Sequence, residues 1–150
     1  MTRILMVCLG NICRSPLAEG ILKSKLDSSQ FYVDSAGTSN YHIGELPDRR
    51  SIAIARTKGI DITDQRSRQF ITSDFDDFDI IYAMDKSNYR NIIHLARNDE
   101  DRQKVKLILE ENPSSSITEV PDPYYDGDRG FEDVYSLLDE ACEIIANNLQ

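Results

Sequence analysis

A cysteine and an arginine stand six positions apart near the start of the chain. They belong to the stretch Val7-Cys8-Leu9-Gly10-Asn11-Ile12-Cys13-Arg14-Ser15-Pro16. A thiolate is an effective nucleophile, and a guanidinium presents a planar fork of N–H donors that matches two oxygens of a phosphate group. The spacing therefore predicts a loop in which a nucleophile lies beside an anion site. Attack on a phosphate ester is the chemistry that suits this pair.

The backbone of this loop can complete the anion site. Consecutive N–H groups can turn inward just ahead of a helix N-terminus, which carries a positive partial charge. Gly10 permits unusual dihedral angles, and Asn11 tolerates the left-handed conformation. The N–H groups, the helix dipole and Arg14 also stabilise a thiolate on Cys8, to which Ser15 can donate its hydroxyl. We predict a phosphate site made of Leu9, Gly10, Asn11, Ile12, Cys13, Arg14 and Ser15.

A second loop supplies a group that the first loop lacks. It reads Pro121-Asp122-Pro123-Tyr124-Tyr125-Asp126-Gly127. A departing alkoxide or phenoxide needs a proton, and Asp122 is a carboxyl group held between two prolines. We predict Asp122 as the general acid, and the two tyrosines after it as a wall for an aryl substrate. A Pro-Asp-Pro sequence alone is more often only a turn.

The elements around these loops can be read from the spacing of apolar residues. Short apolar runs predict strands over residues 2–7, 31–33, 80–84 and 105–109. Helical spacing predicts helices from Pro16 to Leu26, after Asp48 as far as Gly59, after Asp85 or Ser87, and from Phe131 through Ile145. Ser15 is the predicted N-cap of the first helix, with Pro16 in its first turn.

This alternation predicts an α/β fold with a four-stranded parallel sheet in the order 2-1-3-4. Helices would cover both faces and give three layers, in a single domain over residues 1–150. In such folds ligands bind beyond the carboxyl ends of the strands, which is where the Cys8 loop leaves the first strand.

Composition excludes several other classes of protein. The net charge of −9 argues against nucleic acid as a main partner, because phosphate backbones need a basic surface. No apolar run approaches the roughly 20 residues of a membrane span, and we expect no signal peptide. Three cysteines are an odd number, which favours free thiols in a reducing cytoplasm over a disulfide framework.

The remaining reactive residues have simpler interpretations. Cys142 lies on the apolar stripe of the last helix, so we predict that it fills the core. His42 and His94 are isolated, and no spacing suggests a metal site or a cofactor. The acidic cluster over residues 74–79 is interpreted as a solvated face or a helix start.

With both loops described, the chain resembles the low-molecular-weight protein tyrosine phosphatases over nearly its whole length. The signature loop matches from Val7 to Pro16. Further matches are Asp34-Ser35-Ala36-Gly37-Thr38, Ala83-Met84-Asp85 with Ser87-Asn88, and Asp122-Pro123-Tyr124-Tyr125. The resemblance implies metal-free hydrolysis of phosphotyrosine in proteins. Cys8 would form a phosphocysteine intermediate, Arg14 would bind the phosphate, and Asp122 would act first as acid and then as base.

The resemblance also implies roles around these three residues. Asn11 and Ser15 would maintain the loop, and Asp85 would be a structural neighbour. Leu9, Tyr41 and Tyr124 would form a rim deep enough to favour phosphotyrosine over phosphoserine. Cys13 would trap oxidised Cys8 as a reversible disulfide. Tyr124 and Tyr125 resemble positions that are phosphorylated in some members.

One position departs from the family pattern. Many members carry a histidine that braces the loop asparagine where this chain has Gln65. Because glutamine can still hydrogen-bond, we expect a modest effect on loop rigidity. Tyr41 stands at a rim position that is often tryptophan.

Two alternatives differ in class from a phosphotyrosine phosphatase. An arsenate reductase on the same fold needs resolving cysteines in mid-chain, and none lies between Cys13 and Cys142. A phosphate-binding module without turnover would not need Cys8, Arg14 and Asp122 together. The expected partners are phosphotyrosine proteins, with inorganic phosphate as product and competitive inhibitor, and we expect a monomer or weak dimer with a role in signalling.

Overall fold

The structure is a computed structural model that describes residues 1–124 and 127–150. Its strands and helices alternate along the chain. In order they are β1 (Thr2–Cys8), α1 (Arg14–Lys25), β2 (Phe31–Gly37), α2 (Arg49–Thr57), α3 (Asp74–Asp77), β3 (Ile80–Ala83), α4 (Lys86–Leu95), α5 (Asp99–Gln103), β4 (Val105–Leu107), the 3₁₀ helix η1 (Ile108–Glu111) and α6 (Gly127–Leu149).

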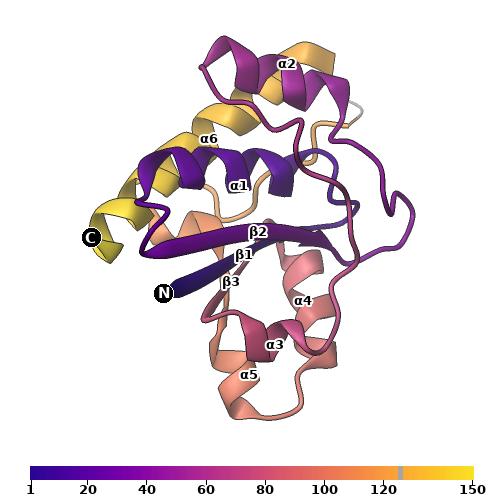
Figure 1. Cartoon of the computed structure of the whole chain (residues 1–150), viewed down its shortest axis with the longest axis vertical. Helices are drawn as coiled ribbons and strands as arrows, with labels where there is room; N and C mark the ends of the chain where they lie inside the picture. The colour runs from indigo at the N-terminus through magenta and orange to yellow at the C-terminus, as the bar shows by residue number, and fades with distance from the viewer. Residues whose placement is uncertain (125–126) are drawn as a thin grey trace.

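The four strands form one parallel sheet in the order β2-β1-β3-β4, which confirms the predicted fold (Figure 1). Strand β1 is central and pairs with β2 and β3. Its last residue, Cys8, lies opposite Gly37, the last residue of β2. The Cys8 loop therefore starts at the carboxyl edge of the sheet, between two neighbouring strands.

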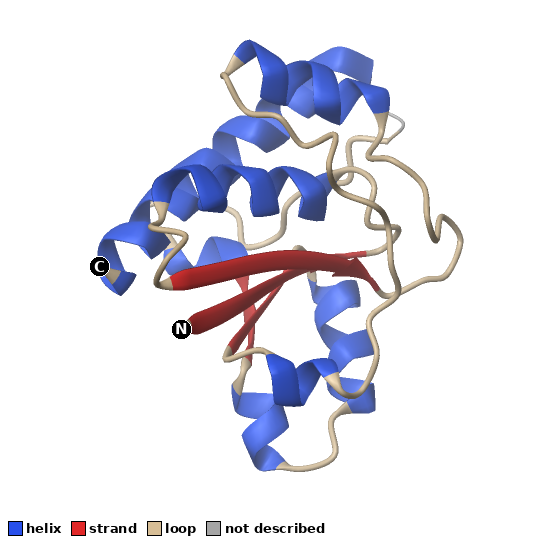
Figure 2. Cartoon of the chain, viewed as in Figure 1, coloured by secondary structure: helices blue, strands red, loops and turns tan. Residues whose placement is uncertain are grey.

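Alternating side chains of β1 build two separate cores. Ile4 and Met6 pack into the larger cluster with α1 and α6, whereas Leu5 and Val7 pack into the cluster with α3 and α4. Figure 2 shows the resulting layers, with the red sheet between helices on both of its faces. A strand buried on both faces needs apolar side chains at every position, which explains the uninterrupted apolar run that leads to Cys8.

Several predicted boundaries are wrong, since β2 continues beyond residue 33 to Gly37 and β3 ends at Ala83. Helix α1 begins at Arg14 with Cys13 as N-cap, so Ser15 lies inside the helix and does not cap it. The Ser15 hydroxyl is engaged by Cys8 and Asn11 instead. Strand β4 ends at Leu107, because Ile108 and Leu109 turn into η1 and bury their side chains in the larger core.

Other local predictions are confirmed. Asp48 caps α2 by accepting from the Arg50 N–H, and Asp85 caps α4 by accepting from the Asn88 N–H. Cys142 is fully buried in the larger core. The acidic cluster does start helix α3, but its first residue, Asp74, is buried against Arg68.

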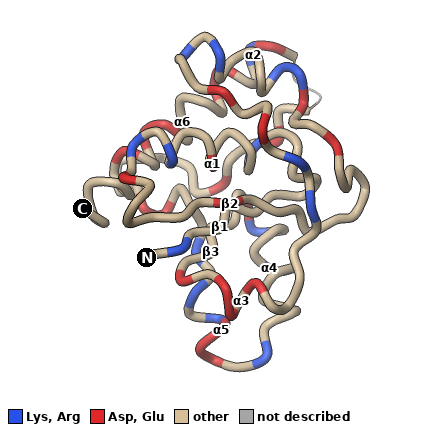
Figure 3. The backbone as a smooth tube through the Cα atoms, viewed as in Figure 1, with Lys and Arg blue, Asp and Glu red and all other residues tan. Residues whose placement is uncertain are grey.

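Acidic and basic residues are interspersed along the backbone (Figure 3). Within residues 1–124 and 127–150, no helix is long and apolar enough to cross a membrane.

Candidate active site

Cys8 lies at the carboxyl end of β1, buried but for 3% of its surface. Its sulfur is 3.0 Å from the Ser15 hydroxyl oxygen and accepts a hydrogen bond from the Asn11 N–H at 3.3 Å. The Asn11 side-chain amide donates to the same hydroxyl oxygen at 2.8 Å. The hydroxyl hydrogen of Ser15 is therefore free to point at the sulfur. Two groups that can donate a hydrogen bond, the Ser15 hydroxyl and the Asn11 N–H, therefore lie at the Cys8 sulfur.

Asn11 links the loop to two distant parts of the chain. Its φ of 57° is the only positive value for a non-glycine residue in the part of the chain that the structure describes, which confirms the predicted left-handed conformation. The side-chain Nδ2 also donates to Ser35 Oγ on β2 at 3.0 Å, and Oδ1 accepts from the Arg68 backbone N–H at 3.0 Å. These contacts fix the turn that directs the Asn11 backbone N–H at Cys8.

The expected reason for Gly10 is wrong. The positive φ belongs to its neighbour Asn11, and Gly10 serves to leave space. A Cβ on Gly10 would lie 3.0 Å from His42 Cδ2. Gly37 is similarly confined, since a Cβ there would lie 2.8 Å from the Leu9 carbonyl oxygen. The absence of side chains at these two positions lets the loop lie close to β2 and to the rim.

Arg14 is held by groups that come from two separate segments, the start of α4 and the loop that carries Asp122. Its Nη1 donates to Asp85 Oδ2 at 2.7 Å and to the Val120 carbonyl oxygen at 2.9 Å, and its Nη2 lies 3.8 Å from Asp122 Oδ2. Burial opposes the charge of Arg14, but Cys8, Asp85 and Asp122 outweigh it and raise the pKa of the guanidinium. Asp85 therefore caps α4 with one oxygen and orients Arg14 with the other.

Asp122 reaches the same place from the far loop, as predicted. Its side chain is 44% exposed, and its Oδ1 accepts a hydrogen bond from the Tyr124 N–H at 3.1 Å. The carboxyl group therefore has one oxygen fixed by its own loop, while the other faces Arg14. Tyr125 lies outside the described residues.

Cys8, Arg14 and Asp122 line one cavity of about 260 Å³. Its other lining residues are Leu9, Gly10, Ile12, Cys13, Tyr41, His42 and Tyr124. The predicted rim residues Leu9, Tyr41 and Tyr124 are all exposed around it. Asn11 and Ser15 are not among the lining residues, and both bond to the Cys8 sulfur and to each other.

His42 is a lining residue that the sequence interpretation missed. Its Nδ1 lies 2.8 Å from Glu45 Oε2, and its ring covers Gly10. Its position directly after Tyr41 was the available signal. An isolated histidine was considered only as a metal ligand, and within residues 1–124 and 127–150 no three His, Cys, Asp or Glu residues are grouped to hold a metal ion.

The two cysteines of the loop differ in their surroundings. Burial raises the pKa of the Cys13 thiol well above its ordinary value, and the negative charges of Asp48 and Cys8 raise it further. Cys13 is therefore a neutral thiol near neutral pH. Both cysteines are free, and both line the cavity.

Gln65 does not take the role that a histidine has in many family members. Its Nε2 donates to the Pro16 carbonyl oxygen at 3.1 Å, so it braces α1 and not Asn11. Its buried Oε1 has no hydrogen-bond partner among the described residues. The bracing of Asn11 comes instead from Ser15, Ser35 and the Arg68 backbone.

The hydrogen bonds behind Asn11 continue to a buried carboxylate that the sequence interpretation also missed. Ser35 Oγ donates to Glu19 Oε1 at 2.7 Å, and Lys23 Nζ donates to Glu19 Oε2 at 2.6 Å. Glu19 is only 3% exposed. A glutamate four residues before a lysine on a helix usually indicates a surface ion pair. Here the acidic partner faces inward.

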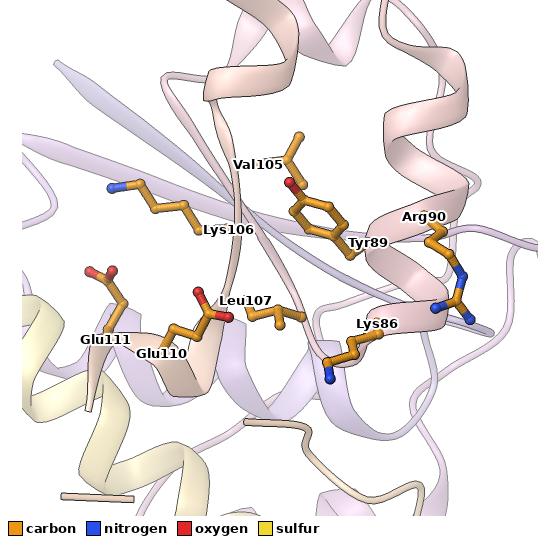
Figure 4. A pocket seen from close by; sticks show the side chains of 8 residues that line it. All are labelled: Lys86, Tyr89, Arg90, Val105, Lys106, Leu107, Glu110 and Glu111. Atoms are coloured by element: carbon orange, nitrogen blue, oxygen red, sulfur yellow. The ribbon is translucent and has the colours of Figure 1, made fainter. Parts of the chain in front are cut away.

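A larger cavity, of about 580 Å³, lies at the edge of the sheet beside β4. Figure 4 shows Lys86 and Arg90 extending from α4 on one side, and Glu110 and Glu111 on the other. This cavity has no cysteine and does not bring its cations together on one point. It lacks the pairing of nucleophile and anion site found around Cys8.

Comparisons with known proteins agree with this geometry. Residues 3–150 match the family model described as "Low molecular weight phosphotyrosine protein phosphatase". A Schizosaccharomyces pombe protein of that description is 41% identical over 91% of this chain and 89% of its own. A protein tyrosine phosphatase structure from Entamoeba histolytica superposes with a TM-score of 0.94 at 37% identity, covering 99% of this chain and 97% of that one. A Drosophila arginine phosphatase superposes with a TM-score of 0.91 at 33% identity, covering 100% and 98%.

Proposed function

The chain belongs to the low molecular weight phosphotyrosine protein phosphatase family, and from this premise we propose how it hydrolyses phosphotyrosine. The reaction proceeds through a phosphocysteine intermediate and without a metal ion, on phosphotyrosine in proteins and on simpler aryl phosphates. One observation carries the proposal. Cys8, with two donors at its sulfur, lines the same cavity as Arg14 and Asp122.

In the first step the Cys8 thiolate attacks phosphorus, forming the P–S bond as the bond to the phenolic oxygen breaks. Asp122 gives its proton to that oxygen, so the leaving group departs as tyrosine. Arg14 and the loop N–H groups carry the charge of the equatorial phosphate oxygens. These fixed donors supply the positioning and charge stabilisation on which phosphoryl transfer depends.

In the second step a water molecule attacks the phosphocysteine, and the P–S bond breaks. The Asp122 carboxylate accepts a proton from this water, which restores the acid for the next cycle. The thiolate returns to its two donors, and inorganic phosphate leaves. Since the product fits the same cradle, we expect it to inhibit competitively.

Substrate choice rests on the rim. Leu9, Tyr41 and Tyr124 surround the opening with exposed apolar surface that an aromatic ring can cover. A phosphoserine side chain is shorter, and its phosphorus reaches the sulfur only if the peptide backbone enters the opening. We therefore propose that phosphotyrosine is preferred over phosphoserine.

Three properties complete the proposal. The protein acts as a single domain over residues 1–150, as a monomer or weak dimer. It works in the reducing cytoplasm, where a free Cys8 thiol persists. Its targets are phosphotyrosine proteins of signalling.

The test is turnover of a phosphotyrosine peptide in excess chelator, with phosphoserine and phosphoarginine peptides alongside. We expect chelator-independent release of phosphate from phosphotyrosine, and acid quenching that traps 32P on Cys8. Cys8→Ser should lose about six orders of magnitude in kcat, as removal of other enzymic nucleophiles does. Cys142→Ala, which alters a buried cysteine of α6 that does not line the cavity, is the matched control and should retain activity.

Several outcomes would contradict the proposal. Substantial activity in Cys8→Ser would exclude the phosphocysteine, and activity lost in chelator would exclude the metal-free route. Preference for phosphoarginine would place the chain with the arginine phosphatase that it resembles in structure. Binding of phosphotyrosine without release of phosphate would indicate a binding module.

A further inference from the structure

A continuous line of hydrogen bonds runs from the Cys8 sulfur to the protein surface. Each of its links is between 2.6 and 3.0 Å long. The residues along it are, in order, Cys8, Ser15, Asn11, Ser35, Glu19 and Lys23. The outer end of the line is the side chain of Lys23, which is 45% exposed. Lys23 lies about 15 residues after Cys8 in the sequence.

We propose that Lys23 is a positioning residue for the reaction at Cys8. By keeping Glu19 ionised, Lys23 holds Ser35 as a donor to Glu19 and an acceptor for Asn11, and so steadies the Asn11 side chain that makes Ser15 donate to the sulfur. The proposal rests on the function proposed for Cys8 and adds a residue outside the cavity that sets the state of the nucleophile.

The direction of the line follows from counting hydrogens, starting at Glu19. An ionised carboxylate can only accept hydrogen bonds, so it takes the single hydroxyl hydrogen of Ser35. The Ser35 oxygen is then left to accept, and the group that faces it is the Nδ2 of Asn11 at 3.0 Å. The charge on Glu19 thus determines the role of Ser35.

The same assignment of hydrogens extends from Asn11 through Ser15 to the Cys8 sulfur. Asn11 Oδ1 accepts from the Arg68 backbone N–H, so its Nδ2 hydrogens point toward Ser35 and Ser15. Because the Ser15 oxygen accepts one of them, its own hydrogen goes to Cys8. A hydrogen bond donated to sulfur favours the thiolate over the thiol.

Lys23 supplies the charge that Glu19 needs in order to stay ionised. Burial raises the pKa of Glu19 above its ordinary value, and the hydrogen bonds from Lys23 and Ser35 hold the rise back. Among the described residues, Lys23 is the cation that pairs with Glu19. Two further acidic groups act on this pair, Asp34 on β2 and Asp64 in the segment before Gln65. Asp34 raises the pKa of Glu19 further, and its own partner is Arg68.

Removal of the lysine charge would therefore move the protonation of Glu19 to higher pH. A protonated carboxyl group can donate as well as accept, so it no longer obliges Ser35 to donate toward it. Asn11 Nδ2 then lacks a fixed acceptor at Ser35, so the side chain that positions the Ser15 hydroxyl is held less firmly. The hydrogen bond from Ser15 to the thiolate weakens, although no residue of the cavity has changed.

The test measures the rate of Cys8 alkylation by iodoacetamide as a function of pH, with the modified peptide quantified by mass spectrometry. We compare the full-length wild type with Lys23→Met, Lys23→Arg and Lys25→Met. Lys25 is the matched control, because it lies on the same helix but pairs with Asp139 and Glu143 of α6. Thermal melts report whether each variant is folded.

We expect Lys23→Met to shift the half-maximal pH of alkylation upward. Alkylation and phosphotyrosine turnover near pH 6 should fall about three- to tenfold, the range found for changes along a coupled network. Lys23→Arg should restore the wild-type profile, and Lys25→Met should not change it. In a Glu19→Gln background, Lys23→Met should have no further effect, since no charge remains to be neutralised.

A wild-type alkylation profile in folded Lys23→Met would overturn the proposal, and so would an equal effect of Lys23→Met with and without Glu19→Gln. If Lys23→Met does not fold, Lys23→Gln, which keeps a donor without the charge, decides by the same criteria. Alkylation needs no turnover. If the alkylation profile shifts between wild type and Lys23→Met but the wild type hydrolyses no phosphotyrosine, the proposed function is refuted and the role of Lys23 is supported.

Discussion

The two loops that meet at the cavity are built in opposite ways. The Cys8 loop is enclosed behind its exposed rim residue Leu9, with Asn11, Arg14 and Ser15 each at most 2% exposed. Asn11 and Arg14 bond to distant segments, and Ser15 bonds to Asn11. The Asp122 loop is open, with Asp122 and Tyr124 both more than a third exposed. It is anchored at Val120, whose N–H donates to the Met84 carbonyl oxygen and whose own carbonyl oxygen accepts from Arg14.

The difference suits the two tasks of the proposed reaction. Attack on phosphorus needs donors that are already oriented, and an enclosed loop keeps them so. Proton transfer needs a carboxyl group that leaving groups and water can reach, and an exposed loop provides it. Changes in the Cys8 loop should therefore affect stability and chemistry together, whereas changes at Asp122 should affect chemistry alone.

Arg14→Lys should have the largest effect and should test the enclosed side. Lysine keeps the charge but cannot bind Asp85, the Val120 carbonyl oxygen and a phosphate in the fixed geometry of a guanidinium. We expect kcat/KM to fall about 10³- to 10⁵-fold, as for other arginines that stabilise phosphoryl transfer, with a lower melting temperature. A small loss of activity in a fully stable variant would contradict the contrast between the loops.

Asp122→Asn should come next and should leave stability unchanged. We expect turnover of substrates with poor leaving groups to fall about 10²- to 10⁴-fold, the usual contribution of a general acid. Substrates whose leaving groups need no proton should lose far less in the first step. The measurement is kcat/KM across aryl phosphates of differing phenol pKa, and an equal loss for all of them would argue against proton transfer by Asp122.

Gly37→Ala tests how tightly the Cys8 loop is confined. The new Cβ would lie 2.8 Å from the Leu9 carbonyl oxygen, a backbone atom that can move only with the loop. We expect a loss of about 1–3 kcal/mol in the free energy of unfolding and a fall in kcat, measured by denaturant titration and by turnover. Gly59→Ala is the control, since its φ of 78° strains an alanine at the end of α2 although no atom lies within 4 Å of the added Cβ. It should leave kcat unchanged.

Gln65→Leu should have the smallest effect. The substitution removes the unpartnered Oε1 together with the hydrogen bond to the Pro16 carbonyl oxygen, and these two losses oppose each other. We expect the free energy of unfolding to change by less than about 1 kcal/mol and kcat to stay within about twofold. A large fall in kcat would show that Gln65 supports the Cys8 loop despite having no contact with Asn11.

The sequence predicted well what depends on neighbouring residues. The strand order, the caps at Asp48 and Asp85 and the left-handed Asn11 all follow from local patterns and general topology. The meeting of Cys8, Arg14 and Asp122 followed from the family resemblance and from the rule that sites form at the carboxyl edge of a sheet.

The features that the sequence could not predict depend on which side chains, distant in sequence, come into contact in the fold. Gly10 is required because His42 lies above it, and Glu19 is buried because Ser35 and Lys23 meet it there. Nothing within a few residues of either position reports these partners. Helix α1 likewise begins before the predicted cap, because the Ser15 hydroxyl bonds to Cys8 and Asn11 and does not cap the helix.

The contacts of Asn11 have a consequence for the order in which the chain folds. Its side chain touches β2 and the segment before α3, which are 24 and 57 residues away along the chain. The conformation that aims its backbone at the sulfur cannot be held until both segments have docked, and contacts of such sequence separation form late and slowly. The nucleophile should therefore become reactive only in the final stage of folding. A partly folded chain would be spared an exposed and reactive thiolate.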